Sequence, residues 1–535
     1  MKKLVLGACV IALAVVASGQ DKKTGIDIDV LNYKIDAELI PAEQKMKARA
    51  EVTYVPKAES RSVVFEMNGS LHITRITMKQ ELPPPEPTPV TVAMTSTKTP
   101  VPAKSPVPAK TPVPAKTPPP KKPANTTEKT PAAAAPVDPT PSLQFVQDNK
   151  EAMNVRIDLG SMQPASKPIT LIFEYDGALD SPQGGPIPNT RLAYVGNNGS
   201  YLYYASRWFP FHEYAADKST AQISITVPQG ITVVGYSDQQ VSGNPAGNKT
   251  TYTFSNAKPM LIGNFAAAQY ISKQYNMGGL TVDVYAKVGD EKGSDHVADV
   301  VGKHLEYYSS KFGAYNFGNR FIVAEVDEDT LEAYSGAGVL FLNPKAFAVG
   351  NSELLARETA YQWWGQTVGI KSFDDAWLMQ GLAQFSGLLY VRDNGNESQF
   401  QQAIQAEVEK ALAFEQAASI RNAPKQLDDQ SAAYRSVVYY KGAVVLNMLR
   451  QLFGEQKFDA FLKDYYAKQT DKNLSLDDFE GIASKAAGRS LRSFFGQWVD
   501  STGVPEFKVE YRMLRNKEGF RVPGTVKQDI EAFEM

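Results

Sequence analysis

Apolar and polar residues alternate along two stretches of the first half of the chain, residues 28–80 and 143–270. In residues 50–55 and 221–227, for example, nearly every second side chain is apolar. A period of two puts apolar side chains on one face of a β-strand, so both stretches predict half-buried strands. We therefore expect an all-β domain over residues 20–272, interrupted by a segment of different composition.

The spacing of apolar residues changes to that of amphipathic helices from about residue 290 onward. This change predicts a mostly helical α+β domain over residues 273–503. Alternation then returns and predicts a short C-terminal β segment over 504–535, which either packs on the preceding domain or begins a further β domain. The expected helices are 297–312, 351–368, 374–392, 397–418, 441–453 and 476–487, and the expected strands are 320–326, 339–342, 507–513 and 520–526.

The segment that interrupts the β domain is rich in proline. Residues 83–141 hold 19 of the chain's 34 prolines, seven lysines and three acidic residues, and a six-residue repeat starts at Thr99. Such a composition cannot bury a core and predicts a disordered, extended spacer. In an alternative hypothesis the basic residues of 98–129 bind an anionic envelope polymer, and the chain is an envelope-associated structural protein.

The first 19 residues predict a secretory signal peptide. Lys2 and Lys3 precede an apolar run over residues 4–17, which is too short to span a bilayer and ends in small residues. The only cysteine, Cys9, lies inside this run, and its lipidation is an alternative to simple cleavage. We expect a secreted, periplasmic or cell-envelope protein with no transmembrane segment after signal cleavage and no disulfide.

The length and net charge of the chain bear on its number of buried cores and on its expected partners. A chain of 535 residues with 43% hydrophobic content is long enough for several buried cores. Its formal net charge is −2, and no nucleic-acid-binding motif is visible. Nucleic acid is therefore not an expected partner.

Three residues have the spacing of a zinc-peptidase site but none is a zinc ligand. Arg357 and Tyr361 lie four apart, on one face of a predicted helix, with Glu358 beside them, and Gln380 on the next helix would close the site. Zinc needs imidazole, thiolate or carboxylate donors, whereas an arginine stays cationic and repels a divalent ion. The four histidines of the chain provide no visible replacement cluster. We predict that the chain holds no zinc cofactor here.

These residues stand within longer motifs that resemble a known family. Residues 357–365 and 374–381 resemble the His-Glu-x-x-His-Gln-Trp-Phe-Gly and Trp-Leu-Asn-Glu-Gly motifs of gluzincin aminopeptidases, the aminopeptidase N and leukotriene hydrolase type. Residues 439–443 and 312–317 are similar to two further motifs of that family. The resemblance implies an N-terminal all-β saddle or sandwich domain followed by a thermolysin-like, mostly helical α+β peptidase domain.

The resemblance also implies roles for single positions. The family's three zinc ligands fall on Arg357, Tyr361 and Gln380, its general base on Glu358 and its transition-state tyrosine on Tyr439. Only the last two match the family. The glutamate that holds the substrate's amino end is replaced as well. The positions that we single out as candidates for the cleft are Arg357, Tyr361, Gln380, Ser335, which stands at that amino-anchor position, and Tyr434.

Three functional hypotheses follow. In the first, the chain is a secreted aminopeptidase-like pseudoenzyme with a degenerate zinc site that binds a peptide or protein. In the second, Glu358 and Tyr439 support residual or altered hydrolysis, and the third is the structural role of the proline-rich repeat. For Arg357 two alternatives stay open, a helical ion pair with Glu353 or a fixed positive charge for a ligand carboxylate.

Overall fold

The structure is a computed structural model that describes residues 27–79, 141–148, 153–179, 190–213, 216–327 and 331–528. The segments up to Lys79 and from Ser142 onward form one unit. The predicted signal peptide, residues 1–19, and residues 83–140 of the predicted spacer lie outside the described residues. No helix of the described part is long and apolar enough to cross a membrane.

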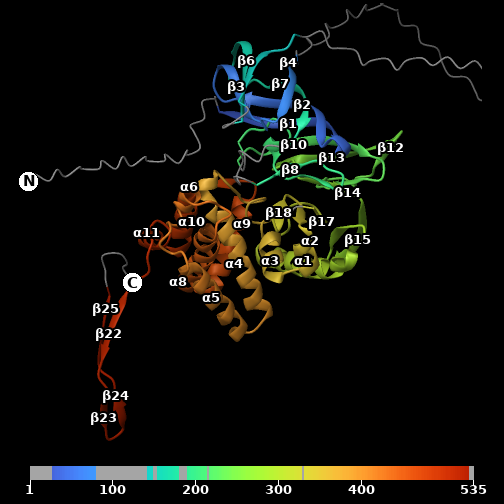
Figure 1. The fold of residues 1–535 in the computed structure, drawn as a ribbon. Coiled ribbons are helices and arrows are strands. Elements are labelled where there is room, and N and C mark those ends of the chain that lie inside the picture. Colours follow the sequence, from blue (N-terminus) through green and yellow to red (C-terminus); the bar gives the residue numbers. More distant parts are fainter. Residues whose placement is uncertain are drawn as a thin grey trace, which may run out of the picture. The chain divides into compact units, whose positions relative to one another are not determined.

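The first part of the chain folds into three β-sheets, as the alternating pattern predicts (Figure 1). The largest has the strand order β12-β13-β10-β1-β2-β7-β4, in which only β1 and β10 run parallel. The smaller sheets have the orders β11-β14-β9-β8 and β3-β6-β5. The strands are β1 (Ile28–Ile40), β2 (Lys45–Pro56), β3 (Ser60–Glu66), β4 (Leu71–Met78), β5 (Gln144–Gln147), β6 (Asn154–Gln163), β7 (Ile169–Ala178), β8 (Ala193–Tyr194), β9 (Ser200–Leu202), β10 (Ser219–Pro228), β11 (Thr232–Gly235), β12 (Asn244–Ala246), β13 (Lys249–Met260) and β14 (Phe265–Ala268).

A five-stranded sheet follows, with the order β15-β16-β17-β19-β18. Its edge strand β18 pairs antiparallel with β19, while β17 runs parallel to both β16 and β19. The sheet places residues 333–336 at a free edge, next to the helices that carry the candidate site. Its strands are β15 (Tyr270–Met277), β16 (Leu280–Lys287), β17 (Arg320–Glu325), β18 (Ala333–Gly336) and β19 (Val339–Leu342).

Helices make up most of the chain after residue 340, as the sequence predicts. The pattern overlooked the short helices α2, α6, α7 and α11 and one long helix, α9, although the buried Phe458, Phe461, Leu462 and Tyr465 of α9 have helical spacing. The helices are α1 (Ser294–Lys311), α2 (Pro344–Val349), α3 (Ser352–Ala360), α4 (Trp377–Asn394), α5 (Glu397–Leu412), α6 (Ala423–Gln426), α7 (Ala432–Tyr434), α8 (Gly442–Phe453), α9 (Glu455–Gln469), α10 (Leu476–Ala487) and α11 (Arg492–Trp498), with two short strands, β20 (Gly369–Ile370) and β21 (Asn473–Leu474).

The predicted helix 351–368 is too long, because α3 ends at Ala360. The side chain of Gln362 leaves the helix direction and bonds the turn between β18 and β19, donating to the carbonyl of Gly336 and accepting from the N–H of Gly338. Gly365 then adopts a φ of 119°, which a residue with a side chain rarely adopts. Both features reverse the chain and lead it toward α4.

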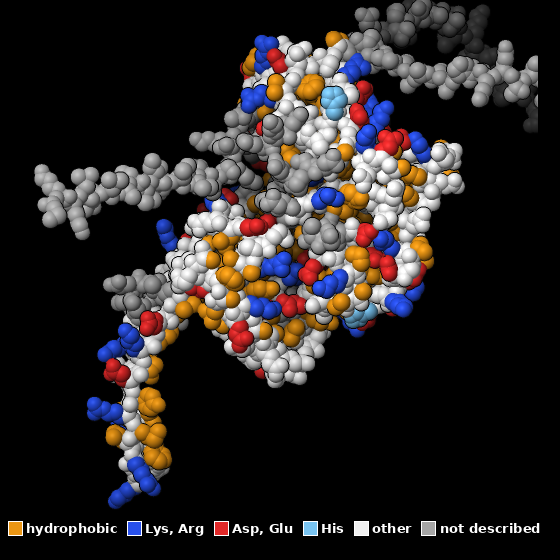
Figure 2. All heavy atoms as spheres, in the orientation of Figure 1, with side chains coloured by type: hydrophobic (Ala, Val, Ile, Leu, Met, Phe, Trp, Pro, Cys, Tyr) orange, Lys and Arg blue, Asp and Glu red, His pale blue; other side chains and the backbone are white. Residues whose placement is uncertain are grey.

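The C-terminal segment forms strands but does not pack on the helical domain. Two antiparallel pairs form, β22 (Phe507–Tyr511) with β25 (Gly524–Gln528) and β23 (Leu514–Asn516) with β24 (Gly519–Arg521). Every residue of β22, β23 and β24 is exposed, so of the two alternatives the burial of these strands does not support a segment packed on the preceding domain. Its apolar side chains gather along one side of the ribbon in Figure 2.

Candidate functional site

Helix α3 positions the first residues of the candidate site. Its N-cap is Asn351, whose side chain accepts hydrogen bonds from the backbone N–H groups of Glu353 and Leu354. Tyr361 is the first residue after the helix but keeps helical backbone angles. The predicted i, i+4 relation of Arg357 and Tyr361 therefore survives although the helix is shorter than expected.

The carboxylate of Glu358 is engaged at both oxygens. Its Oε1 accepts from Nε of Arg357 at 3.2 Å, and its Oε2 accepts from the hydroxyl of Ser335 at 2.7 Å. Glu358 is only 6% exposed, so little water competes with these partners. A general base needs a free acceptor within reach of its substrate's proton. In this arrangement both acceptor atoms already have a donor.

Arg357 points inward rather than along the surface of its helix. Its guanidinium carbon lies 5.4 Å from the ring centroid of Tyr439, a cation–π geometry, and Nη1 donates to Oε1 of Gln384 at 3.4 Å. Burial acts to lower the pKa of Arg357, but the charge of Glu358 and the two nearby tyrosines outweigh it, and the net shift is upward. The predicted ion pair with Glu353 does not form. Glu353 instead pairs with Lys410 at 3.0 Å.

Two tyrosines complete the centre of the site. Tyr439 lies in a π-helical segment, Arg435–Lys441, a rare conformation that is frequent at functional sites. The hydroxyls of Tyr361 and Tyr439 are hydrogen-bonded to each other. Burial raises the pKa of both hydroxyls, so each stays protonated at neutral pH. Neither phenol is available as a phenolate.

Gln380 and Tyr434 close the other side of the site. The hydroxyl of Tyr434 donates to Oε1 of Gln380 at 2.8 Å, and its ring centroid lies 6.3 Å from that of Tyr439. The structure therefore brings all seven candidate residues into one chain of contacts. They are Ser335, Arg357, Glu358, Tyr361, Gln380, Tyr434 and Tyr439.

The residues at the three family ligand positions do not fit zinc. A guanidinium has no lone pair to donate, and the ion pair of Arg357 with Glu358 fixes its positive charge in the centre of the site. Tyr361 is a buried, neutral phenol, and the carbonyl oxygen of Gln380 already accepts from Tyr434. Catalytic zinc sites use three imidazole, thiolate or carboxylate ligands. We derive no step through a metal at this place.

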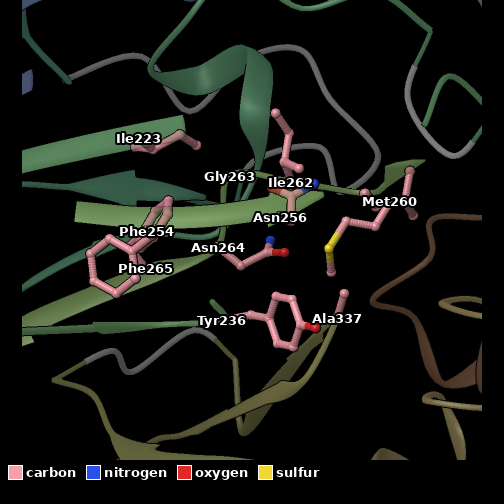
Figure 3. A pocket seen from close by; sticks show the side chains of 11 residues that line it. Ile223, Tyr236, Phe254, Asn256, Met260, Ile262, Gly263, Asn264, Phe265 and Ala337 are labelled. Carbon is pink, nitrogen blue, oxygen red and sulfur yellow. The ribbon is translucent and has the colours of Figure 1, made fainter. Parts of the chain in front are cut away.

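Two surface hollows lie beside the edge strand β18. One, of about 290 Å³, is lined by Tyr203, Tyr334, Gln366 and Asn264 among others, and its neighbour of about 330 Å³ extends to Ala337. In Figure 3 the side chains of Tyr236, Asn264 and Met260 point toward one another in the second hollow. The linings of the two hollows share Asn264, so the hollows adjoin each other, and we call the two together the β18 groove.

A glutamine of the β18 groove has an unused acceptor. Nε2 of Gln366 donates to the carbonyl of Ser335 at 3.1 Å, whereas its buried Oε1 has no hydrogen-bond partner among the described residues. An unsatisfied buried acceptor is costly, and a ligand N–H would satisfy it. Sequence reasoning missed Gln366, although it directly follows the recognised run 357–365.

Sequence reasoning also missed the residues behind Arg357. Gln384 is 3% exposed and bridges Arg357 to Glu407, donating to its Oε1 at 3.3 Å. Lys410 donates to the same oxygen at 3.3 Å, while Oε2 of Glu407 has no partner within the described part. Burial raises the pKa of Glu407 to about 7. The only signal in the sequence is the helical spacing of Glu407 and Lys410 on α5.

Replacing Glu407 by glutamine should remove a pH dependence of stability. Because the folded pKa is raised from 4.5 to about 7, the folded state holds the proton that the unfolded state has lost. The stability linked to this proton is complete below pH 4.5 and disappears as pH rises through 7. We expect Glu407→Gln to be more stable than wild type at pH 8, by up to about 3 kcal/mol, and equal to it near pH 4.5.

Urea unfolding at the two pH values measures this difference. The exposed Glu409 of the same helix supplies the control, because Glu409→Gln should follow the wild-type profile. Parallel pH profiles for Glu407→Gln and wild type would contradict the assignment.

The structure overturns one expectation about metals. The histidines were expected to form no ligand cluster, but Asp27, His212 and Glu213 each place a ligand atom within 4.8 Å of the others. Two of these residues are neighbours in sequence, whereas Asp27 immediately precedes β1. The sequence shows that His212 and Glu213 are neighbours, but it does not indicate that Asp27 lies beside them.

Comparisons with known proteins agree with the resemblance stated above. Residues 298–498 match the Peptidase family M1 domain. The glutamyl aminopeptidase of Homo sapiens is 23% identical over 327 residues, which cover 57% of this chain and 34% of that protein. The "Probable aminopeptidase 1" of Saccharolobus solfataricus is 23% identical over 325 residues, 56% of this chain and 41% of that protein. The chain thus spans between a third and about two fifths of the length of these relatives.

Solved structures confirm the predicted fold. The M1 zinc metallopeptidase from Deinococcus radiodurans superposes with a TM-score of 0.67 at 16% identity, covering 90% of this chain and 96% of that one. Its complex with a Tyr-Ser-Ala substrate gives a TM-score of 0.65. The all-β first domain, the helical second domain and the short β segment are therefore an M1-type architecture.

Proposed function

Residues 298–498 match the Peptidase family M1 domain, and from this premise we propose that the chain holds no zinc at the family's catalytic position and binds a peptide or protein instead of hydrolysing it. One observation carries the proposal. The guanidinium of Arg357 stands at a family ligand position and pairs with Glu358, the family's general base. The positive charge that a metal would supply is thus replaced by one that the chain itself provides.

The contacts of Arg357 explain why hydrolysis is disfavoured. In zinc peptidases the metal lowers the pKa of its bound water and polarises the scissile carbonyl, which contributes several kcal/mol. A buried arginine can polarise an oxygen but cannot deliver an activated water. Glu358, the group that would take the proton, is held by Arg357 and Ser335. The site would therefore bind a peptide and the transition state of its hydrolysis about equally well, so that binding would not accelerate the reaction.

The β18 groove is the place where we expect the ligand. Tyr203 and Tyr334 stack there with ring centroids 4.8 Å apart, which provides a flat aromatic wall. The unused Oε1 of Gln366 needs an N–H donor, and every peptide bond except those of proline offers one. Ser335 connects this groove to Glu358 and Arg357, so a peptide could satisfy Gln366 and reach the guanidinium with a carboxylate.

The proposed location is secreted, periplasmic or at the cell envelope. The support is the N-terminal sequence alone, in which Lys2 and Lys3 precede an apolar run and small residues. An extracellular or envelope peptide would then be the class of ligand.

A pool of tripeptides with free or amidated carboxyl ends tests the binding proposal by saturation-transfer NMR. We expect binding of free-acid peptides that falls at least about tenfold in Gln366→Leu, because an apolar side chain cannot accept the peptide N–H. The exposed Gln401 of α5 provides the control variant, Gln401→Leu. Equal binding to wild type and Gln366→Leu, or no binding at all, would refute the proposal.

Residual hydrolysis is the competing proposal, because Glu358 and Tyr439 lie in one site. Wild type and Glu358→Gln are compared on aminoacyl and peptide substrates. Equal background rates for the two proteins dismiss hydrolysis, whereas a rate that depends on Glu358 supports it.

A further inference from the structure

A histidine of the all-β domain is held in the orientation that metal-binding histidines adopt. Nδ1 of His212 lies 2.8 Å from Oδ2 of Asp217, whose side chain is only 6% exposed. A carboxylate beside Nδ1 accepts a hydrogen bond from the N–H of that nitrogen and so favours the tautomer whose lone pair is on Nε2. The side chain of His212 is itself 11% exposed, so Nε2 is the ring atom available to an incoming ion.

The carboxylate behind His212 is itself anchored. Both oxygens of Asp217 lie 3.2 Å from the backbone N–H of Val30, near the start of β1. Phe211, the residue before His212, exchanges two backbone hydrogen bonds with Glu66, at 2.8 and 2.9 Å. The histidine is therefore held through the residue before it and through its ring, which is the support that a metal ligand requires.

Two carboxylates stand beside this histidine. One oxygen of Asp27, one of Glu213 and a ring nitrogen of His212 lie within 4.8 Å of one another. The carbonyl of Asp27 accepts from the N–H of Lys57 at 3.0 Å, so the backbone at this ligand is also fixed. Metal–ligand bonds of about 2.0–2.2 Å require these atoms to approach one another by only a small side-chain movement.

We propose that Asp27, His212 and Glu213 bind a divalent transition-metal ion of the zinc type, with Asp217 as the positioning residue for His212. One imidazole and two carboxylates carry a net charge of −2, which the ion neutralises. Imidazole favours zinc-like ions over magnesium and calcium, which prefer all-oxygen sites. Three protein ligands leave a position for water. The site belongs to the all-β domain and is independent of the proposed function.

Lys57 provides a further test of the proposal, because its ammonium group competes with the metal ion for the carboxylate of Asp27. Its Nζ lies 3.2 Å from Oδ2 of Asp27, in a pair whose two side chains are more than half exposed. An exposed pair of this kind contributes about 0–1 kcal/mol, which metal coordination readily overcomes. Removing the lysine charge should therefore strengthen metal binding, whereas a cluster held only by ion pairs would be weakened.

The test is a zinc titration of the chelator-treated full chain by calorimetry, with metal content measured after dialysis. We expect one zinc per wild-type chain, loss of it in His212→Ala and in Asp27→Asn, and an affinity about 10- to 100-fold lower in Asp217→Asn. Lys57→Met should bind several-fold more tightly. His296→Ala is the matched control, since Nε2 of His296 lies 3.1 Å from the carbonyl of Gly350 and outside the cluster.

Testing two ligand variants separates loss of the metal site from failure of one variant to fold. Asp27 is exposed, so Asp27→Asn is expected to fold even if His212→Ala does not. Zinc at the wild-type site should show one nitrogen and otherwise oxygen neighbours in its X-ray absorption spectrum. The proposal would be overturned if the zinc content were unchanged in both Asp27→Asn and His212→Ala. It would also be overturned if the wild-type chain took up no zinc.

Discussion

Changing Arg357→His, Tyr361→His and Gln380→Glu together should give the chain one additional zinc ion. The change replaces a cation, a neutral phenol and an amide by the donor types that catalytic zinc sites use. It also releases Glu358 from its ion pair with Arg357. The backbone already holds positions 357 and 361 one helical turn apart, so the ligands need no new fold.

Metal analysis in a His212→Ala background measures this gain, because that background removes the other proposed site. We expect no tightly held zinc in His212→Ala alone and one per chain after the three changes are added. The restored site should remain a poor aminopeptidase until Ser335→Glu also returns the amino anchor. A zinc ion already present in His212→Ala would contradict the proposed loss of the metal.

Removing only the cation of Arg357 should be strongly destabilising. In Arg357→Met the carboxylate of Glu358, which is 6% exposed, loses the only cationic partner it has among the described residues and keeps the hydroxyl of Ser335. Breaking one partner of a buried ion pair costs about 3–5 kcal/mol. The double variant Arg357→Met, Glu358→Gln should recover most of this loss, because no buried charge then remains unpaired.

Urea unfolding of the four proteins at pH 7 gives the coupling energy of the pair. The exposed pair of Lys303 and Asp299 on α1 serves as the control, and Lys303→Met should cost no more than about 1 kcal/mol. If the effects of Arg357→Met and Glu358→Gln simply add, the two side chains do not form the pair on which the proposed function rests.

The elements that were predicted best are those whose own periodicity decides their structure. Strand β19 and helix α10 have the predicted bounds, 339–342 and 476–487. Helix α3 ends early because Gln362 bonds the β18–β19 turn, a contact with a segment about 25 residues earlier in sequence that no local pattern can show. The C-terminal strands were predicted, but whether they pack depends on a partner surface and not on their alternation.

In the candidate site, too, some features were predictable from the sequence and others were not. The spacing of residues 357–361 and 380 was sufficient to predict a candidate site and the replacement of its zinc ligands. The partner of Arg357 was not predictable, because Glu353 is available by helical spacing and is instead drawn to Lys410. Gln384 and Glu407 belong to no recognisable motif. Their hydrogen-bonded connection to Arg357 is evident only from their buried positions behind it.

By itself the sequence determined the class of fold and predicted the position of the candidate site and its residue types unsuited to zinc, since these depend on periodicity, spacing and donor chemistry. Only the tertiary structure decided which charges are paired and which are left over. It tied Glu358 to Arg357 and Ser335, left an acceptor of Gln366 open, and brought Asp27 to His212. The reason is that pairing energies depend on distance and burial, which arise from contacts between residues far apart in the chain.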